Sequence, residues 1–397
     1  MVSIDQALSL VLDGLPPLAA ERVALADAAG RVVAEPAAGA VDLPPFDRSA
    51  MDGYAVRAAD TAPGVPLRLA GGVAAGEVAT ATLEPGTAAR VSTGAAIPPG
   101  ADAILQSELA TEHDGTVAPE RSLAPGTHVR YRGEDLTAGT VLAAPGSVLT
   151  LPRISALASA GVGEVAVHRR PHLHLIVTGS ELLPLGAPIE PGKIHESNGL
   201  MVRLLAGRVG AEVTDHGVIG DDREATIAAV EAGLAGDVLV VSGGVSVGPH
   251  DHVKTAFETC GAEEVFWRVR IKPGKPLWFG RRGDTLVFGL PGNPLSTIVC
   301  FSVFIAPALR RLQGERDARP DYCAGRLTAP ATAADDRTTF LTAALRPGAD
   351  GVLEATPTER QGSHMTGALG ESNGFAVAPD EAGELPAGAP VDVLRLD

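Results

Sequence analysis

Cysteine, lysine and asparagine are scarce in this 397-residue sequence. The three cysteines, Cys260, Cys300 and Cys323, are widely spaced and odd in number, which excludes a disulfide framework and a zinc knuckle. The longest strongly apolar run, residues 297–309, is too short to span a bilayer. The first residues include acids and no basic region, so the sequence shows no signal peptide. We therefore expect a soluble, cytoplasmic protein with no membrane partner.

The charge balance is acidic, with 32 basic and 48 acidic side chains and a formal net charge of −16. This balance argues against binding to nucleic acid or to anionic membranes, because both require a basic face. A hydrophobic share of 45% and a charged share of 20% are close to globular averages. The chain can therefore bury a core, and its length suits two or three ordinary domains.

Lysine is confined to the middle of the chain. Four of the 32 basic residues are lysines, and the other 28 are arginines. The lysines are Lys193, Lys254, Lys272 and Lys275. A lysine ammonium docks as a compact point charge, whereas an arginine guanidinium is a planar fork. We infer that this part of the chain holds sites where ammonium geometry matters; chance clustering in a small sample is the alternative.

The order of the hydrophobic patterns predicts an α/β multidomain protein with four parts. Residues 1–45 and 140–170 are expected to form a discontinuous, helical linking part. Short alternating runs broken by glycine and proline predict a β-rich part over 46–139. Strands that alternate with helices over 171–315 predict a doubly wound, mostly parallel sheet domain. Strand-like runs over 316–397 predict a small C-terminal β barrel.

Polar loops follow four of the expected strands of the sheet domain. Ligands bind at the carboxyl ends of strands in open α/β sheets. At these ends the sequence has TGSEL at 178–182, GDD at 220–222, SGGVSVGPHD at 242–251 and GLPGNPLS at 289–296. One such loop could be ordinary turn or capping chemistry, but four on one edge favour a site. The candidate substrate contacts in these loops are Ser242, Gly243, Gly244, Ser246, Pro291, Asn293 and Pro294.

The glycine-rich loop at 242–248 would let the backbone approach an anion closely. It is not a Walker A loop, because no Lys-Ser/Thr pair follows its last glycine. A G-x-G-x-x-G fingerprint is also missing from the first strand-to-helix turn. ATP hydrolysis of the P-loop kind and Rossmann dinucleotide binding are therefore disfavoured.

Charged side chains of both signs are expected beside this loop. Glu181, Asp221 and Asp251 come from three loops on the same edge, and three hard oxygen ligands predict a Mg²⁺ site. The alternative is three solvated surface acids. Residues 268–275 (RVRIKPGK) carry four positive charges, and Lys254 is expected nearby. Such a cluster suits a phosphate ester or an oxyanion, with a solvated basic turn as the alternative.

Nine stretches in order along the chain resemble the molybdopterin molybdenumtransferase family, known as MoeA and as the E domain of gephyrin. They are DRSAMDGYAV at 47–56, STGAAIPPGADA at 92–103, RYRGEDL at 130–136, TGSEL at 178–182, KIHESN at 193–198, GDD at 220–222, SGGVSVGPHD at 242–251, IKPGKP at 271–276 and GLPGNP at 289–294. The resemblance implies an enzyme that inserts molybdate into adenylylated molybdopterin and releases AMP in a Mg²⁺-dependent step. It also implies an elongated homodimer whose active cleft is shared between the subunits.

By the same resemblance, two parts of the chain line the cleft. Asp47, Thr93 and Asp135 would face it from the β-rich part of one subunit. On the sheet domain of the other subunit, the lining residues would be Glu181, Asp221, Asp251, Ser246, Lys272 and Lys275, with Pro291 and Pro294 shaping the floor. Carboxylate-bound Mg²⁺ and lysines on the oxyanions would offset charge while the phosphoanhydride is cleaved.

One residue departs from the family pattern, and two other functions stay open. Ser180 stands where the family has the aspartate of T-G-D-E-L, so the metal shell loses one potential ligand. A molybdopterin adenylyltransferase shares the sheet domain, but that reaction needs a single domain and leaves the β segments at 47–135 and 315–397 unexplained. A non-catalytic scaffold of the gephyrin E-domain type is the other alternative. The adenylyltransferase is also a candidate transient partner.

Overall fold

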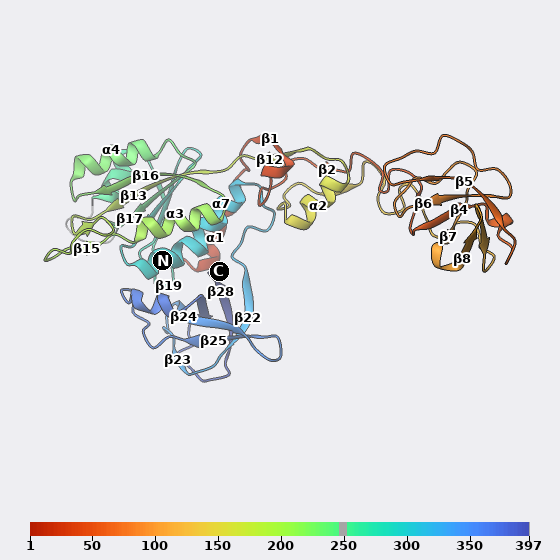
Figure 1. The fold of residues 1–397 in the computed structure, drawn as a ribbon. Coiled ribbons are helices and arrows are strands. Elements are labelled where there is room, and N and C mark those ends of the chain that lie inside the picture. The colour runs from red at the N-terminus through yellow and green to blue at the C-terminus, as the bar shows by residue number, and fades with distance from the viewer. Residues whose placement is uncertain (246–251, 397) are drawn as a thin grey trace.

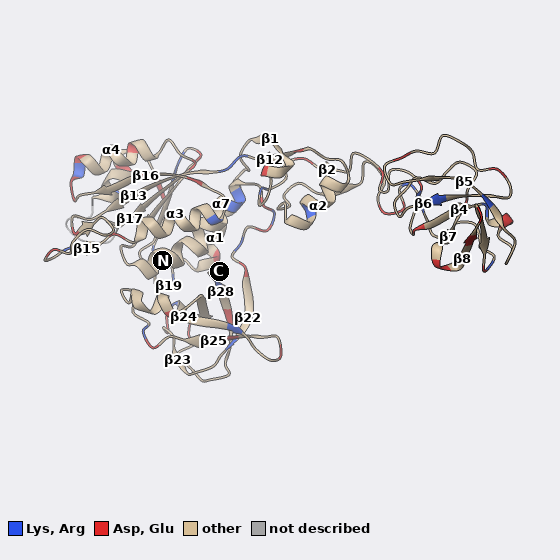
Figure 2. Cartoon of the chain, viewed as in Figure 1, with Lys and Arg blue, Asp and Glu red and all other residues tan. Residues whose placement is uncertain are grey.

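The computed structural model describes residues 1–245 and 252–396. The chain is long: the sheet domain and the C-terminal barrel lie together at one end, and the β-rich part lies at the other (Figure 1). Basic and acidic side chains occur in every part (Figure 2). A slender linking region joins the two ends, so residues of the β-rich part are remote from the sheet domain within one chain.

The linking region is built from segments far apart in sequence. Strand β1 (Ala20–Ala24) pairs antiparallel with β12 (Glu164–His168), and β2 (Ala37–Ala38) pairs with β11 (Val141–Ala143). The 3-10 turn η1 (Leu25–Asp27) and helix α2 (Leu151–Ser159) cover a small apolar core of their own. The chain thus leaves this region toward the β-rich part and returns to it.

The β-rich part holds a six-stranded sheet in the order β7-β4-β6-β5-β9-β8. These strands are β4 (Gly53–Val56), β5 (Leu67–Val73), β6 (Thr87–Val91), β7 (Ala103–Gln106), β8 (Ala110–His113) and β9 (Thr116–Pro119), with the 3-10 turns η2 (Ala58–Asp60) and η3 (Ser107–Leu109). β3 (Arg48–Ser49) and β10 (Val129–Arg130) form a separate short antiparallel pair. The glycine- and proline-broken runs therefore form short strands, as expected.

The sheet domain has the strand order β16-β13-β17-β21-β20-β18. The first four strands are parallel: β13 (His172–Thr178), β16 (Glu212–Ile219), β17 (Val238–Ser242) and β21 (Thr285–Leu290). Helix α3 (Asn198–Arg208) packs on one face with α1 (Ile4–Leu12), while α4 (Arg223–Gly233) and α5 (Val253–Thr259) pack on the other. The prediction of a doubly wound, mostly parallel sheet is confirmed.

Two antiparallel strands at one edge of this sheet are missing from the sequence-based prediction. Strand β20 (Trp278–Arg282) pairs antiparallel with β21, and β18 (Glu263–Trp267) pairs antiparallel with β20. Both mix aromatic and charged residues, so neither shows the continuous apolar run of the central strands. A small parallel pair, β14 (Leu182–Leu183) and β15 (Ile194–His195), projects from the end of the sheet domain that is farthest from the linking region (Figure 1).

The last helix of the sheet domain runs through α6 (Pro294–Cys300), a π-helical turn η4 (Phe301–Ile305) and α7 (Ala306–Leu312). Among the described residues it is the one helix long and apolar enough to cross a membrane by length and composition. This helix has 19 residues and is longer than the apolar run identified in the sequence. However, 83% of its most apolar stretch is buried inside the protein. It is a core helix of the sheet domain.

The C-terminal part is a closed five-stranded barrel, as predicted. Strands β22 (Tyr322–Leu327), β24 (Thr338–Pro347), β25 (Leu353–Pro357), β26 (Gly374–Ala378) and β28 (Pro390–Arg395) form a ring that β24 and β26 close. A short pair, β23 (Ala331–Thr332) and β27 (Glu384–Leu385), and the 3-10 segment η5 (Thr366–Glu371) complete it. Strand β19 (Ile271–Lys272) of the sheet domain adds to β24, which docks the barrel directly beside the basic segment.

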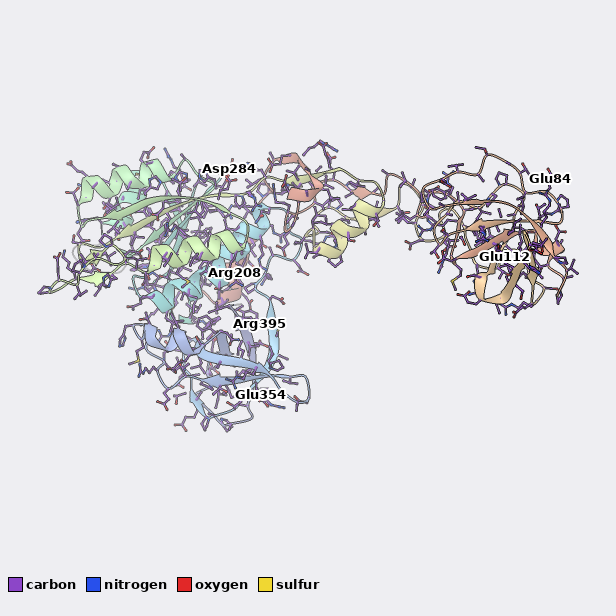
Figure 3. All side chains as sticks on the ribbon, viewed as in Figure 1. Glu84, Glu112, Arg208, Asp284, Glu354 and Arg395 are labelled. Carbon is purple, nitrogen blue, oxygen red and sulfur yellow. The ribbon has the colours of Figure 1, made fainter. Side chains whose placement is uncertain are left out.

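A second contact holds the end of the barrel to the sheet domain. Arg208, in the last turn of α3, donates a hydrogen bond to the backbone carbonyl of Leu396. Arg208 and Arg395 are both labelled at this junction in Figure 3. This contact adds to the pairing of β19 with β24 in holding the barrel against the sheet domain.

Candidate active site

The polar loops of the sheet domain gather on one edge, as the sequence predicts. Val177 pairs with Ser242, and Ser242 pairs with Leu290, so β13, β17 and β21 end side by side. Ser242 is fully buried. The segments that follow these strands therefore meet at the carboxyl edge of the sheet.

Asn198 connects these strand ends, and the sequence analysis did not select it. It is 9% exposed, and its Nδ2 donates to Ser242 Oγ at 3.1 Å and to the Gly292 carbonyl at 2.8 Å. Its Oδ1 is buried and has no hydrogen-bond partner within the described part of the chain, and neither has Thr178 Oγ1. Most buried polar atoms in folded proteins have a hydrogen-bond partner, so these two oxygens are exceptions. The only signal in the sequence was the KIHESN stretch that ends in this asparagine.

Gly243 and Gly244 are required by packing. Both have positive φ, +99° and +65°. A Cβ on Gly243 would lie 2.6 Å from the Thr178 carbonyl oxygen, and one on Gly244 would lie 2.5 Å from Val253 Cγ2. The start of the glycine-rich loop is thus pressed between β13 and α5, and any side chain would push it out of place.

Ser180 and Asp221 are hydrogen-bonded to each other across two loops. Ser180 Oγ accepts from the Asp221 backbone N–H at 2.9 Å, and the Ser180 N–H donates to Asp221 Oδ2 at 3.3 Å. Lys193 donates to the Ser180 carbonyl. The exposed Glu181 lies beside Gly179, where its Oε2 would be 2.6 Å from an added Cβ. The serine that departs from the family pattern therefore fixes the loop that presents Asp221.

The described residues alone do not make the predicted Mg²⁺ site. Glu181 and Asp221 lie on neighbouring loops, but Asp251 lies outside the described residues, as does Ser246. Over 1–245 and 252–396, no group of three His, Cys, Asp or Glu side chains comes together in a way that could hold a metal ion. Two carboxylates fall short of the three protein ligands predicted from the sequence.

Lys272 and Lys275 lie in a cavity between the sheet domain and the barrel. Its volume is about 280 Å³. Pro291, Asn293 and both lysines line the wall formed by the sheet domain. Pro294 follows as the first residue of α6. The structure thus brings the IKPGKP and GLPGNP stretches together around one cavity.

The other wall of this cavity comes from the barrel, which the sequence analysis did not connect with the site. It includes Arg337, Gln361 and Ser363. Ser363 Oγ accepts a 3.1 Å hydrogen bond from Asn293 Nδ2. Arg337 donates to Asp336 Oδ1 at 2.9 Å, and this bond, with further help from Lys275, holds the pKa of Asp336 below its usual range. Three cationic side chains and several neutral donors thus surround one cavity, which suits an oxyanion.

The three predicted residues of the β-rich part are Asp47, Thr93 and Asp135, and each has its own surroundings there. The Asp47 carboxylate accepts from the Arg132 N–H at 2.8 Å. The Thr93 N–H donates to Asp52 Oδ1 at 2.8 Å. Asp135 lines an open groove of about 1040 Å³. Within one chain this part is remote from the sheet domain, so a single subunit does not bring its residues to Lys272 (Figure 1).

Lys254 lies on α5, on the opposite face of the sheet from the cavity. Its Nζ is 3.0 Å from the centre of the Trp267 ring. The prediction that Lys254 stands near the basic segment is correct in the sense that Arg268, the first residue of that segment, contacts the same ring. Lys272 and Lys275 contribute instead to the cavity against the barrel.

Family models match three consecutive parts of the chain. The MoeA N-terminal region (domain I and II) matches residues 2–161, a probable molybdopterin binding domain matches 174–311, and the MoeA C-terminal region (domain IV) matches 324–396. A molybdopterin molybdenumtransferase from Haemophilus influenzae is 36% identical over 397 residues, which cover 99% of this chain and 98% of that relative. This chain belongs to the MoeA family.

Other MoeA comparisons agree over the full length. A molybdopterin molybdenumtransferase from Bacillus subtilis is 34% identical over 405 residues, covering 100% of this chain and 94% of the relative. Two crystal structures of molybdopterin biosynthesis MoeA proteins from Pyrococcus horikoshii are 32% and 29% identical, with TM-scores of 0.86 and 0.84. They cover all of this chain and 99% and 100% of theirs. The resemblance read from the nine sequence stretches is thus confirmed, and the MoeA fold includes all four parts.

Proposed function

We propose that this protein is the transferase of molybdenum cofactor biosynthesis that inserts molybdate into adenylylated molybdopterin and releases AMP. The observation that carries the proposal is the cavity in which Lys272, Lys275 and Arg337 surround one space. Molybdate is a tetrahedral dianion, and the adenylylated pterin carries a pyrophosphate. Ammonium and guanidinium groups suit such anions, because charge-assisted hydrogen bonds to oxyanion oxygens are shorter and stronger than hydrogen bonds between neutral groups.

In this proposal each wall of the cavity has its own task. The two lysines bind oxyanion oxygens as point charges, and Arg337 offers a planar fork from the barrel. Ser363, fixed by Asn293, supplies a neutral donor. These groups stabilise negative charge that develops as the phosphoanhydride is cleaved, without moving at that moment. Mg²⁺ supplies further charge compensation when bound, with Glu181 and Asp221 as the described residues able to contribute.

We further propose that the active cleft is shared in a homodimer. Asp47, Thr93 and Asp135 carry the family motifs of the β-rich part but lie at the far end of the chain from Lys272 (Figure 1). A second copy would bring them to the sheet edge. We place the reaction in the cytoplasm, with the adenylyltransferase as a transient partner that hands over the adenylylated pterin.

Single-turnover release of AMP from adenylylated molybdopterin tests the function. We expect release to require both molybdate and Mg²⁺ in the wild type and to fall at least a hundredfold in Asp221→Ala. Arg22→Gln, an exposed charge in the linking region, is the matched control and should leave the rate unchanged. An adduct that binds without releasing AMP under any oxyanion would exclude the transferase and leave a binding protein.

Mixing two inactive variants tests the shared cleft. Asp135→Asn removes a residue of the β-rich part, and Asp221→Ala removes one of the sheet domain. If the cleft combines two subunits, random mixed dimers hold one intact site of two, and the mixture should recover about a quarter of wild-type activity. Recovery near zero, with mixed dimers verified by mass, would place the whole site within one chain.

A further inference from the structure

A cavity of about 430 Å³ lies where the sheet domain meets the barrel. Helix α3 and the helix that runs from η4 into α7 supply its wall on the side of the sheet domain, and β22 and β28 supply the wall on the side of the barrel. Arg208 and Arg395, both labelled in Figure 3, belong to this lining. Small-molecule sites in proteins commonly have such a volume and lie between domains. The cavity is therefore a candidate binding site.

This cavity is separate from the candidate active site. None of its described lining residues lines the cavity that holds Lys272 and Lys275. Arg208 lies just before the amino end of β16, whereas Asp221 follows the carboxyl end of that strand. The eight residues of β16 span about 25 Å. A ligand bound here would therefore occupy a second site, at the opposite end of β16 from Asp221.

Arginine dominates the charge of the cavity. Arg208, Arg310 and Arg395 line it, and Asp321 is the one acidic residue among its described lining residues. Within the described part of the chain, neither Arg208 nor Arg310 forms an ion pair with Asp321 or with any other carboxylate. Acidic side chains nevertheless outnumber basic ones in this chain by 48 to 32. Two guanidinium charges thus face one cavity without an ion-pair partner from the residues described.

Both of these arginines keep N–H donors for a ligand. Arg208 donates one hydrogen bond, to the Leu396 carbonyl, and Arg310 Nη2 donates one, to the Arg319 carbonyl at 3.2 Å. A guanidinium carries further donors in a planar fork that matches the oxygens of a phosphate. Arg310 is half-buried, and its Nε has no hydrogen-bond partner among the described residues. An anion in the cavity would bind through the donors that remain.

Much of the remaining wall is apolar. Its described lining includes Leu205, Val209, Phe301, Ala306 and Leu394. Phe301 and Leu394 are 1% and 6% exposed, so these side chains belong to the packed interior. Apolar walls with a few polar groups that fix orientation are typical of sites for small organic molecules. An inorganic ion would leave these walls without a contact.

We propose that this cavity binds a small organic phosphate whose ester group is apolar or aromatic. The guanidinium groups of Arg208 and Arg310 bind the phosphate oxygens, and the apolar walls contact the organic group. A phosphate monoester carries close to two negative charges at neutral pH, which suits two guanidinium groups. Because the ligand contacts helices of the sheet domain and a strand of the barrel, its binding stabilises the docking of the two domains.

Calorimetry with phenyl phosphate tests the site, with inorganic phosphate and phenol as probes of its two halves. We expect phenyl phosphate to bind the wild-type protein in a saturable way and the other two probes to bind at least tenfold more weakly. Phenyl phosphate should also raise the Tm, since a ligand that binds only the folded state stabilises it. The titration is repeated with Lys272→Gln, which removes a cation of the other cavity and should leave the Kd unchanged.

Substitutions in the wall of the cavity show where the probe binds. Arg208→Gln and Arg310→Gln should each raise the Kd for phenyl phosphate at least tenfold, because each removes one cation. Ser302→Leu keeps both arginines but adds an apolar side chain to the wall, so it should weaken binding by filling the cavity. Arg22→Gln, an exposed charge in the linking region, is the control and should bind as the wild type does. Circular dichroism establishes that each variant is folded.

Four results would overturn the site. Phenyl phosphate could fail to bind the wild type, or inorganic phosphate could bind as tightly as phenyl phosphate. Phenyl phosphate could also bind Arg208→Gln, Arg310→Gln and Ser302→Leu as tightly as the wild type. Finally, it could lose affinity only in Lys272→Gln, which would place it in the candidate active site. None of these measurements involves AMP release, so this site and the transferase can fail independently.

Discussion

Asn293 of the sheet domain donates a 3.1 Å hydrogen bond to Ser363 of the barrel, although 70 positions separate them. This bond lies at the cavity where Lys272 and Lys275 face Arg337. The pairing of β19 with β24 holds the two domains together beside it. The distance between the cations is therefore set by how the barrel docks, and neither domain alone contains the complete cavity.

Arg337→Gln should weaken oxyanion binding without unfolding the protein. The Arg337 side chain is 25% exposed, and its partner Asp336 is 62% exposed, so Asp336 stays solvated when the guanidinium is removed. We expect the apparent KM for molybdate in AMP release to rise at least tenfold, because one of three cations is lost. Arg346→Gln, an exposed arginine near the other end of β24, is the control. Equal KM values in the two variants would show that the oxyanion binds outside the cavity.

Asn198→Ala should destabilise the sheet domain. The change leaves Ser242 Oγ and the Gly292 carbonyl without the donor that now serves both. Burying unsatisfied polar groups costs about 1–3 kcal/mol, so urea unfolding should shift by that amount. Arg346→Gln, at an exposed position of the barrel, is the control, and we expect it to cost less than about 0.5 kcal/mol. If both variants lost the same free energy of unfolding, the hydrogen bonds of Asn198 would not stabilise the sheet domain.

The alternation of strands and helices was sufficient to predict the sheet domain and the edge where Ser242 and Asp221 lie. Periodicity reveals each element, and parallel topology then determines which loops share an edge. Neither periodicity nor parallel topology predicts which segments pair when they are far apart in the sequence and belong to different domains. Arg337 and Ser363 carry no pattern that points to Lys272; they reach it only because β19 joins the barrel.

The sequence also could not predict on which face of the sheet a given lysine lies. Lys254 and Lys275 both appear in the basic, central part of the chain, and their sequence positions suggest one cluster. The structure assigns them to different faces of the sheet, because α5 packs against Trp267 while the segment after β19 turns toward the barrel. The antiparallel strand that ends in Trp267 was not predicted, so the separation could not be seen.

Gly244→Ala should cost more stability than Gly261→Ala, although both glycines have positive φ, +65° and +76°. A Cβ on Gly261 would meet nothing within 4 Å, so only the backbone strain of about 1–2 kcal/mol is expected. At Gly244 the Cβ would be 2.5 Å from Val253 Cγ2, which adds about 1–3 kcal/mol of overpacking. Urea unfolding measures both. Identical losses would show that α5 moves away freely.

Acid should destabilise the sheet domain through His174. This side chain is 7% exposed, and its Nδ1 lies 2.9 Å from His216 Nε2. Burial, with His172 and His216 nearby, lowers the pKa of His174 below its ordinary value of 6.5. The folded protein then keeps this imidazole neutral where the unfolded chain protonates it. The stabilisation is present above about pH 6.5 and is lost as the pH falls from there through the lowered pKa.

Urea midpoints at pH 7.5, 6.5 and 5.5 measure this loss. We expect the wild-type midpoint to fall over the two steps, and His174→Gln to show a flatter dependence because glutamine does not titrate. His113→Gln, which replaces an exposed histidine of the β-rich part, should keep the wild-type slope. A His174→Gln slope as steep as that of the wild type would assign the acid sensitivity to other groups, since only a group whose proton affinity differs between the folded and unfolded states contributes to it.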